Sequence, residues 1–159
     1  MSTTPAIGEP VPGFRCPSTA GNTFDFATLR GTSALVLYFY PRDSTPGCTR
    51  EGEGFRDLYA QFQDAGAEIL GVSRDSLASH ERFRAKLGLP FHLLSDGDSS
   101  LCNQFAVIKP KNMYGKQVVG IERSTFLIDR EGVLRSEWRK VKVPGHPEAV
   151  LEALKQIQQ

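Results

Sequence analysis

Apolar residues alternate along the chain between continuous runs and helical spacing, a pattern that predicts strands alternating with helices. The run Ala34–Tyr40 is apolar and aromatic and ends at Pro41, as expected for a strand buried on both faces of a parallel sheet. Beyond a break that ends at Gly47, apolar residues follow at the spacing of one helix face, and Gly66 is suited to end this helix. The residues on that face are Phe55, Leu58, Tyr59 and Phe62.

The same alternation continues to the C-terminus. We expect a strand over Glu68–Ser73, followed by a helix that Ser76 caps and Gly88 ends. The remaining expected elements are a short strand or extended segment over Phe91–Leu94, a short helix capped by Asp98 or Ser99, a strand over Ser124–Asp129, a returning strand over Val133–Val141 and a helix bearing Val150, Leu151, Leu154 and Ile157.

The first thirty residues are rich in glycine and proline, which predicts an extended segment on the surface. Ala20, Gly21 and Asn22 separate two short β-prone stretches in this region and are suited to close a hairpin.

The order of these elements defines the expected fold class. The early alternation implies parallel strands joined by crossover helices, and the last two strands imply an antiparallel hairpin. We therefore expect an α/β protein with a mixed central sheet flanked by helices and an N-terminal hairpin extension. The thioredoxin-like fold is the natural candidate. Because no linker or repeat interrupts the chain, residues 1–159 are expected to form a single domain.

Length and charge exclude several classes of protein. A chain of 159 residues buries enough surface to fold without disulfides or a structural metal. The formal net charge of +1 argues against a general nucleic-acid binder, because such affinity depends on neutralising phosphates. No apolar run approaches the roughly 20 residues of a membrane-spanning helix, and no secretory signal is visible. We expect no membrane association and a cytoplasmic location.

The side chains that often bind metals or cofactors are scattered. His80, His92 and His146 lie in different expected elements, and no paired-cysteine spacing or phosphate-binding loop is present. We therefore expect neither a metal nor a cofactor. The cysteines are odd in number and far apart, which argues against a disulfide framework and leaves a reactive thiol as the open possibility. They are Cys16, Cys48 and Cys102.

Cys48 lies in a segment suited to stabilise a thiolate. Thr45 is a good N-cap and Pro46 then occupies the first helical position, which places Cys48 at the third. The unpaired N–H groups and the positive dipole end at that position favour a thiolate over a thiol. The alternative is that Cys48 is a small core residue in the first turn of the helix.

The spacing Pro41-x-x-x-Thr45-x-x-Cys48 resembles the active-site signature of the peroxiredoxins. Two further segments extend this resemblance toward the bacterioferritin comigratory protein, or PrxQ, subfamily. Gly120–Asp129 is similar to the segment that brings an arginine to the cysteine, and Lys111–Lys116 is similar to the loop that precedes it. The resemblance covers nearly the whole chain.

The resemblance implies a thiol-dependent peroxidase that reduces hydrogen peroxide and organic hydroperoxides in antioxidant defence and redox homeostasis. Cys48 would attack the peroxide as a thiolate and become a sulfenic acid. Arg123, with its permanent charge and fork of donors, would hold both the thiolate and the peroxide. Thr45 would hydrogen-bond to either of them, and Pro41 would restrict the loop and shield the site from water. Taken alone, Arg123 also fits a solvated charge at a strand edge.

How the sulfenic acid is reduced is a separate question. Subfamily members carry a second cysteine either five residues after the first or in the following helix, where this chain has Glu53 and Glu81–Arg84. A one-cysteine mechanism is therefore favoured, in which an external thiol such as thioredoxin, glutaredoxin or glutathione attacks Cys48. Cys102 is the leading alternative as an internal partner and Cys16 a more distant one. Either is also compatible with a buried core residue.

Two other functions are compatible with the same residues. One is a redox-sensing or chaperone-like binding protein that uses the Cys48 sulfenic acid as a signal, and the other is a scaffold without chemistry. Turnover of peroxide with a thiol reductant distinguishes the peroxidase from both. The resemblance further implies a monomer or, at most, a weak dimer.

Overall fold

The computed structural model describes residues 4–158, and its central sheet has five strands in the order β5-β4-β3-β8-β9. The first three are parallel to one another, whereas β8 runs antiparallel to both β3 and β9, so the expected mixed sheet is confirmed. The strands are β3 (Ala34–Phe39), β4 (Ala67–Ser73), β5 (His92–Ser95), β8 (Ser124–Ile128) and β9 (Leu134–Arg139).

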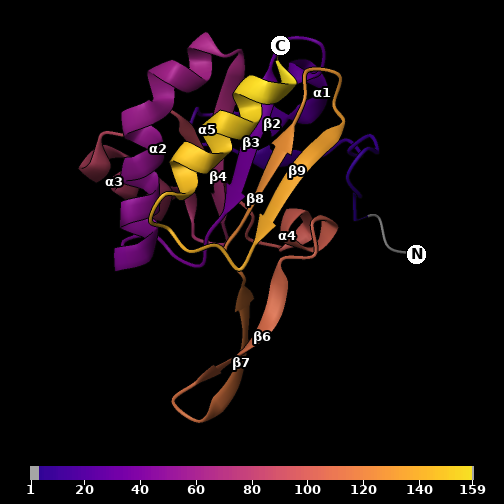
Figure 1. Ribbon diagram of the computed structural model, residues 1–159. Helices are drawn as coiled ribbons and strands as arrows, with labels where there is room; N and C mark the ends of the chain where they lie inside the picture. The colour runs from indigo at the N-terminus through magenta and orange to yellow at the C-terminus, as the bar shows by residue number, and fades with distance from the viewer. Residues whose placement is uncertain (1–3, 159) are drawn as a thin grey trace.

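Three long helices pack over one face of this sheet (Figure 1). They are α2 (Pro46–Asp64), α3 (Leu77–Leu87) and α5 (His146–Ile157). The opposite face is covered by shorter elements, namely the hairpin of β1 (Arg15–Pro17) and β2 (Thr23–Asp25), with α1 (Phe26–Leu29) and α4 (Ser100–Gln104). Among the described residues, none of the helices combines the length and the apolar character needed to cross a bilayer.

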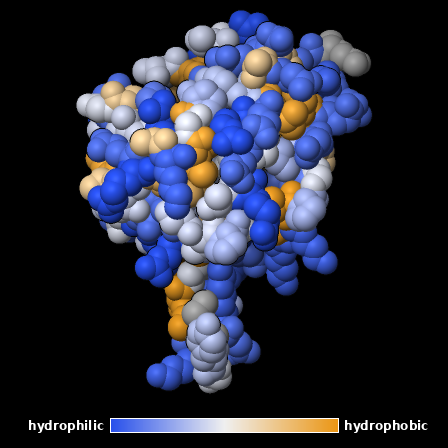
Figure 2. Space-filling view, turned by 90° about the vertical axis from the view of Figure 1, so that its left-hand side faces the viewer, coloured by the Kyte–Doolittle hydropathy of each residue, from blue (hydrophilic) through white to orange (hydrophobic). Residues whose placement is uncertain are grey.

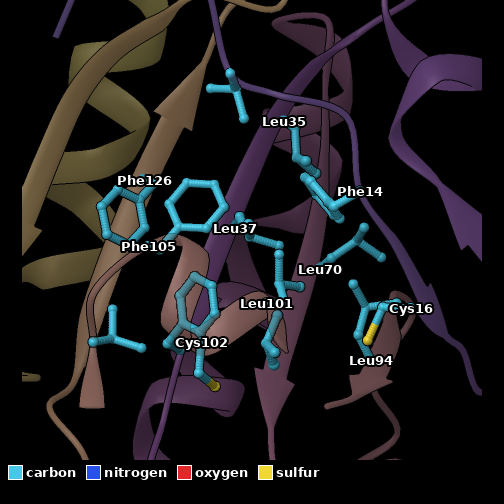
Figure 3. Packing of buried hydrophobic residues seen from close by; sticks show 14 of the residues in the cluster. Phe14, Cys16, Leu35, Leu37, Leu70, Leu94, Leu101, Cys102, Phe105 and Phe126 are labelled. Carbon is cyan, nitrogen blue, oxygen red and sulfur yellow. The ribbon is translucent and has the colours of Figure 1, made fainter. Parts of the chain in front are cut away.

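The two faces of the sheet bury separate cores because side chains alternate along each strand. In β3, Leu35, Leu37 and Phe39 point into one core, while Val36 and Tyr38 point into the other. Every residue of β3 is buried, as its continuous apolar run predicted. We call the core beneath α2, α3 and α5 the helix-side core and the other the hairpin-side core, which Figure 3 shows at close range.

The expectation of a surface segment over the first thirty residues is wrong. The hairpin itself is confirmed, with Arg15 opposite Asp25. However, Val11, Phe14 and Phe26 are buried in the hairpin-side core, with Phe14 and Phe26 stacked at 5.0 Å between ring centroids. Glycine and proline set the local backbone shape here, whereas the few apolar side chains between them decide where the segment packs.

The segment expected as a loop before Arg123 is instead a β-hairpin. Strands β6 (Ile108–Met113) and β7 (Lys116–Ile121) pair with each other, and Tyr114 and Gly115 turn between them with positive φ angles of 54° and 79°. We call this hairpin the arm. It projects from the body of the molecule (Figures 1 and 2). The arm buries little surface, so its residues lack the apolar pattern by which strands are recognised in a sequence.

The short helix α4 begins where expected, but its start is held differently. Ser99 occupies the N-cap position without a side-chain hydrogen bond, and Asp98 accepts from the Ser100 N–H. The carboxylate of Asp96 instead accepts from the N–H groups of Leu101 and Cys102, at 3.0 and 2.7 Å. The capping carboxylate therefore comes from the end of β5.

Candidate active site

The loop after β3 and the start of α2 form the centre of the candidate site. Thr45 is the N-cap, Pro46 follows at the start of the helix, and Cys48 is the third helical residue, as predicted. The side chain of Thr45 does not cap the helix, however. Its hydroxyl donates to the carbonyl of Arg42 at 2.9 Å and so closes the loop that begins at half-buried Pro41.

Arg123 reaches Cys48 from a part of the chain 75 residues away. Its Nη2 donates to the Cys48 sulfur over 3.4 Å. The sheet creates this contact, since β8 begins next to Arg123 and pairs with β3 so that Ser124 lies opposite Phe39, at the end of the sheet where α2 starts. Cys48 is only 2% exposed and packs against the helix-side core. Its side chain therefore has apolar neighbours on one side and the cationic Arg123 on the other.

Glu51 is a member of the site that sequence reasoning missed. Its Oε1 accepts from Nη1 of Arg123 at 2.6 Å, and the carboxylate is fully buried. Burial raises the pKa of Glu51 to about 7, and the positive charge of Arg123 opposes the rise. A signal was present in the sequence, because residues three apart share a helix face and Glu51 follows Cys48 at that spacing.

Gly47 leaves room for the guanidinium. A Cβ atom at this position would lie 2.9 Å from Nη2 of Arg123, closer than real Cβ contacts allow. The glycine therefore serves the approach of Arg123 to Cys48 rather than a special backbone angle.

A buried polar network holds the loop between Pro41 and Thr45. Asp43 lies at its centre: Tyr40 donates to Oδ1 at 2.6 Å, and Ser79 donates to Oδ2 at 2.8 Å. The backbone N–H of Asp43 donates to Asp75 at 2.9 Å. These bonds fasten the loop to the start of α3 and to the end of β4.

His80 completes this network inside the protein. Nδ1 lies 2.7 Å from Oδ2 of Asp43, and Nε2 lies 2.9 Å from the carbonyl of Leu94. Burial opposes ionisation of Asp43, but the hydrogen bonds from His80 and Tyr40 outweigh it and lower the pKa of the carboxyl. Both ring nitrogens of His80 therefore lie within hydrogen-bonding distance of acceptor oxygens.

This network also contains the side chains best placed to hold a cation. Potential ligand atoms of Asp43, Asp75 and His80 lie within 4.8 Å of one another. Both ring nitrogens of His80 are nevertheless already engaged, Nδ1 with Oδ2 of Asp43 and Nε2 with the carbonyl of Leu94. The arrangement therefore fits a hydrogen-bonded anchor for the loop better than a metal site.

The other two cysteines lie on the opposite side of the sheet. Cys16 and Cys102 are buried in the hairpin-side core and are labelled in Figure 3. All three cysteines are free. Burial raises the pKa of Cys16 to about 12 and also raises the pKa of Cys102, with nearby Asp96 adding to both shifts. The structure therefore does not bring either thiol together with Cys48.

The chain is similar to several known proteins along most of its length. A family model described as the AhpC/TSA family matches residues 7–137. Peroxiredoxin Bcp of Xanthomonas campestris is 58% identical over 154 residues, which cover 96% of each chain. Peroxiredoxin Bcp of Bacillus subtilis is 46% identical over 151 residues, covering 95% of this chain and 96% of that protein. A solved structure of the Xanthomonas campestris bacterioferritin comigratory protein, studied for its alkyl peroxide reduction activity, has a TM-score of 0.87 at 55% identity, covering 92% of each chain.

Proposed function

The chain belongs to the AhpC/TSA family and, within it, to the Bcp/PrxQ peroxiredoxins, and from this premise we propose how its site works. As a member of this family it is a thiol-dependent peroxidase with a thioredoxin-like fold. We propose that Cys48 reduces hydrogen peroxide and organic hydroperoxides through a sulfenic acid, which an external thiol then reduces. The observation that carries this proposal is the 3.4 Å hydrogen bond from Arg123 to the Cys48 sulfur.

In the first half-reaction the Cys48 thiolate attacks the terminal oxygen of the peroxide. A sulfur–oxygen bond forms and the oxygen–oxygen bond breaks, and the departing oxygen takes a proton and leaves as water or an alcohol. Negative charge moves from sulfur to the oxygens during this step. Arg123 is aimed at the sulfur before the peroxide arrives, so it stabilises that charge without having to reorganise.

Thr45 and Pro41 have supporting roles in the proposal. The Thr45 hydroxyl uses its proton toward the carbonyl of Arg42, which leaves its oxygen free to accept from the O–H of a peroxide. Pro41 restricts the backbone at the start of the loop and limits the access of water.

The second half-reaction is proposed to follow a one-cysteine route. Neither Glu53 nor Arg84 can form a disulfide at the positions where relatives carry a second cysteine, and the sheet separates Cys48 from Cys16 and Cys102. An external thiolate would attack the Cys48 sulfur, forming a mixed disulfide as the hydroxyl leaves and takes a proton to become water. A second thiol then breaks the mixed disulfide and releases Cys48.

The biological setting is proposed on the same basis. The reductant is thioredoxin, glutaredoxin or glutathione, and the enzyme acts in antioxidant defence in the cytoplasm. Residues 1–159 form one domain that works as a monomer or weak dimer, without a cofactor.

The decisive experiment measures the intact mass of the protein after one equivalent of hydrogen peroxide. The expected product has gained one oxygen, located on Cys48 by peptide mapping. A loss of two hydrogens mapped to Cys48 and Cys102 would overturn the one-cysteine route. In parallel, Cys48→Ser is expected to abolish peroxide consumption with dithiothreitol, whereas Cys102→Ala is expected to retain it. Full activity of Cys48→Ser would reject Cys48 as the nucleophile.

A further inference from the structure

The arm has two chemically different faces. Cross-strand pairs share a face of a hairpin, and the observed register places Lys109 opposite Gly120, and Lys111 opposite Val118. Because side chains alternate along each strand, Lys116 lies on this same face. The other face carries Pro110 paired with Val119, and Ile108 paired with Ile121 at the base of the arm. All three lysines of the arm therefore lie on one face, and no acidic residue occurs between residues 108 and 121.

The arm also concentrates exposed apolar surface. Five large hydrophobic side chains are exposed among the described residues, and three of them belong to the arm. Tyr114 at the tip is 99% exposed, Val119 is 64% exposed and Val118 is 37% exposed. In the space-filling view the arm is a narrow projection that carries both hydrophilic and hydrophobic residues (Figure 2). Such a mixture is typical of surfaces that meet a partner.

The basic face lies beside the catalytic thiol. Lys111 bends over Gly120 and donates to the carbonyl of Ile121 at 2.6 Å, two residues before Arg123. Burial and the positive charge of Arg123 lower the pKa of Lys111, and Cys48 opposes this shift. Arg74 donates to the carbonyl of Val119 at 3.4 Å and brings another positive charge to the base of the arm. A molecule that reaches Cys48 from this side therefore meets a cationic surface.

We propose that the basic face of the arm is the docking surface for a protein thiol reductant whose reactive cysteine is bordered by acidic and apolar side chains. The inference rests on the proposed function, because it requires a sulfenic acid on Cys48 that an external thiol reduces. Opposite charges favour encounter of such a partner with Lys109, Lys111 and Lys116. Val118, on the same face, supplies apolar contact area.

The shape of the arm favours a protein over a small thiol. Small molecules bind in concave sites that enclose most of their surface, whereas Tyr114 and the two valines stand on a projecting hairpin. A folded partner can cover such a projection and place its thiol at the base, where Cys48 lies. Its reactive thiolate attacks the Cys48 sulfur and forms a mixed disulfide, the sulfur–oxygen bond breaks, and the hydroxide leaves and takes a proton from solvent to become water. The partner's second thiol then attacks the partner's sulfur in the mixed disulfide. The partner is thereby oxidised to a disulfide, and Cys48 is released as a thiolate.

The test compares reductants on a charge-reversed arm. Lys109→Glu combined with Lys116→Glu changes two residues that make no contact with the Cys48 sulfur, and leaves Lys111 in place. The matched control is Lys86→Glu combined with Lys155→Glu, which makes the same charge change in the last turns of α3 and α5. Those turns lie at the end of the sheet opposite to Cys48. There Gln158, directly after α5, donates to the carbonyl of Ala65, shortly before β4 begins. The reductants are a bacterial thioredoxin with its reductase and NADPH, dithiothreitol, and glutathione.

The arm variant is expected to lose about tenfold or more in kcat/KM for thioredoxin, because electrostatic steering changes association rates by at least that factor. Its rate of Cys48 oxidation by hydrogen peroxide and its turnover with dithiothreitol are expected to match those of the wild type and of the control. The wild-type rate with thioredoxin should also fall as ionic strength rises, and the variant should lose this dependence.

Several results would overturn the docking proposal while leaving the peroxidase intact. The first is an unchanged kcat/KM of the arm variant with thioredoxin, and the second is an equal loss of kcat/KM in the control variant. The third is a loss of activity with glutathione alone. The fourth is an oligomeric state that differs between the wild type and the arm variant, which would indicate that a second copy of the chain occupies the arm. A fall in the oxidation of Cys48 itself would mean that the arm acts on the peroxide step. Absence of turnover with every reductant, in the wild type as well, would count against the proposed function instead.

Discussion

The guanidinium of Arg123 donates to the buried carboxylate of Glu51 over 2.6 Å. This bond fixes Nη1 of the guanidinium and leaves Nη2 directed at the Cys48 sulfur. Glu51 and Cys48 stand on one face of α2, whereas Arg123 arrives from the start of β8. The helix therefore carries both the nucleophile and the group that aims its cationic partner.

Replacing Glu51 should affect catalysis through the position of Arg123. Glu51→Ala removes an acceptor of a charge-assisted hydrogen bond worth about 1.5–3 kcal/mol, so Cys48 oxidation by peroxide should slow by about 10- to 100-fold. Glu51→Gln keeps an acceptor oxygen at Nη1 and should stay within about tenfold of the wild type. The measurement is the second-order rate of Cys48 oxidation in a single turnover. Equal rates for the two variants would show that the acceptor at this position does not aim Arg123.

The fork of Arg123 should matter beyond its charge. Arg123→Lys keeps one positive charge but cannot donate to Glu51 and Cys48 together from a rigid plane. The rate of peroxide reduction is expected to fall by about 100-fold or more, as when one donor to a developing charge is removed. The stability of the folded protein in urea serves as the control. Wild-type kinetics in this variant would reduce the role of Arg123 to a simple positive charge.

Gly47 should prove important for function rather than for folding. In Gly47→Ala the new Cβ lies 2.9 Å from Nη2 of Arg123 and displaces it from the sulfur. We expect the oxidation rate to fall by about tenfold, an amount that corresponds to roughly 1.4 kcal/mol. Gly97→Ala is the matched control, since a Cβ there meets no atom within 4 Å. A crystal structure of the Gly47→Ala variant with Arg123 unmoved would contradict this explanation.

The buried pair of Asp43 and His80 should contribute strongly to stability. His80→Leu removes one partner and leaves the buried Asp43 carboxylate without one of its hydrogen-bonding side chains. Removing one partner of such a buried pair costs about 3–5 kcal/mol, which urea unfolding measures directly. Asp43→Asn combined with His80→Leu should recover part of this loss, because no uncompensated charge remains. If the single and double variants unfold alike, the pair is not coupled.

His146 should make the protein less stable as the pH falls. The imidazole shares a 2.8 Å hydrogen bond with Thr125, and burial, aided by Arg123, lowers the pKa of His146 to about 4. The unfolded chain binds a proton at His146 below the ordinary pKa of about 6.5, whereas the folded protein binds it only near pH 4. The free energy of unfolding therefore falls across this window by about 3 kcal/mol.

Glu51 acts on stability in the opposite direction, since its pKa of about 7 adds stability as the pH falls from 7 toward 4.5. The informative quantity is therefore the difference between wild type and His146→Gln in urea unfolding at a series of pH values. The variant should lose less stability than the wild type between pH 6.5 and 4. Parallel pH profiles would show that His146 is not buried as a neutral ring.

Local features of the site were predictable from the sequence because they depend on neighbouring residues. The helix start at Thr45, the position of Cys48 in its first turn and the burial of β3 follow from capping, proline geometry and a short apolar run. Glu51 was within reach of the same reasoning, three residues from Cys48. The arm was not, because Lys109–Val119 packs against little else and carries no periodic apolar signal.

The sequence by itself determined where a thiolate would be favoured, since a helix terminus is a local structure. Only the tertiary structure decided which distant groups surround that thiol. Pairing of β8 with β3 brings Arg123 to Cys48. The β1–β2 hairpin and α4 pack against the opposite face of the same sheet and so place Cys16 and Cys102 in the other core. Such contacts depend on strand register and on which face a residue occupies, and both are set by the packing of the whole sheet rather than by any short segment.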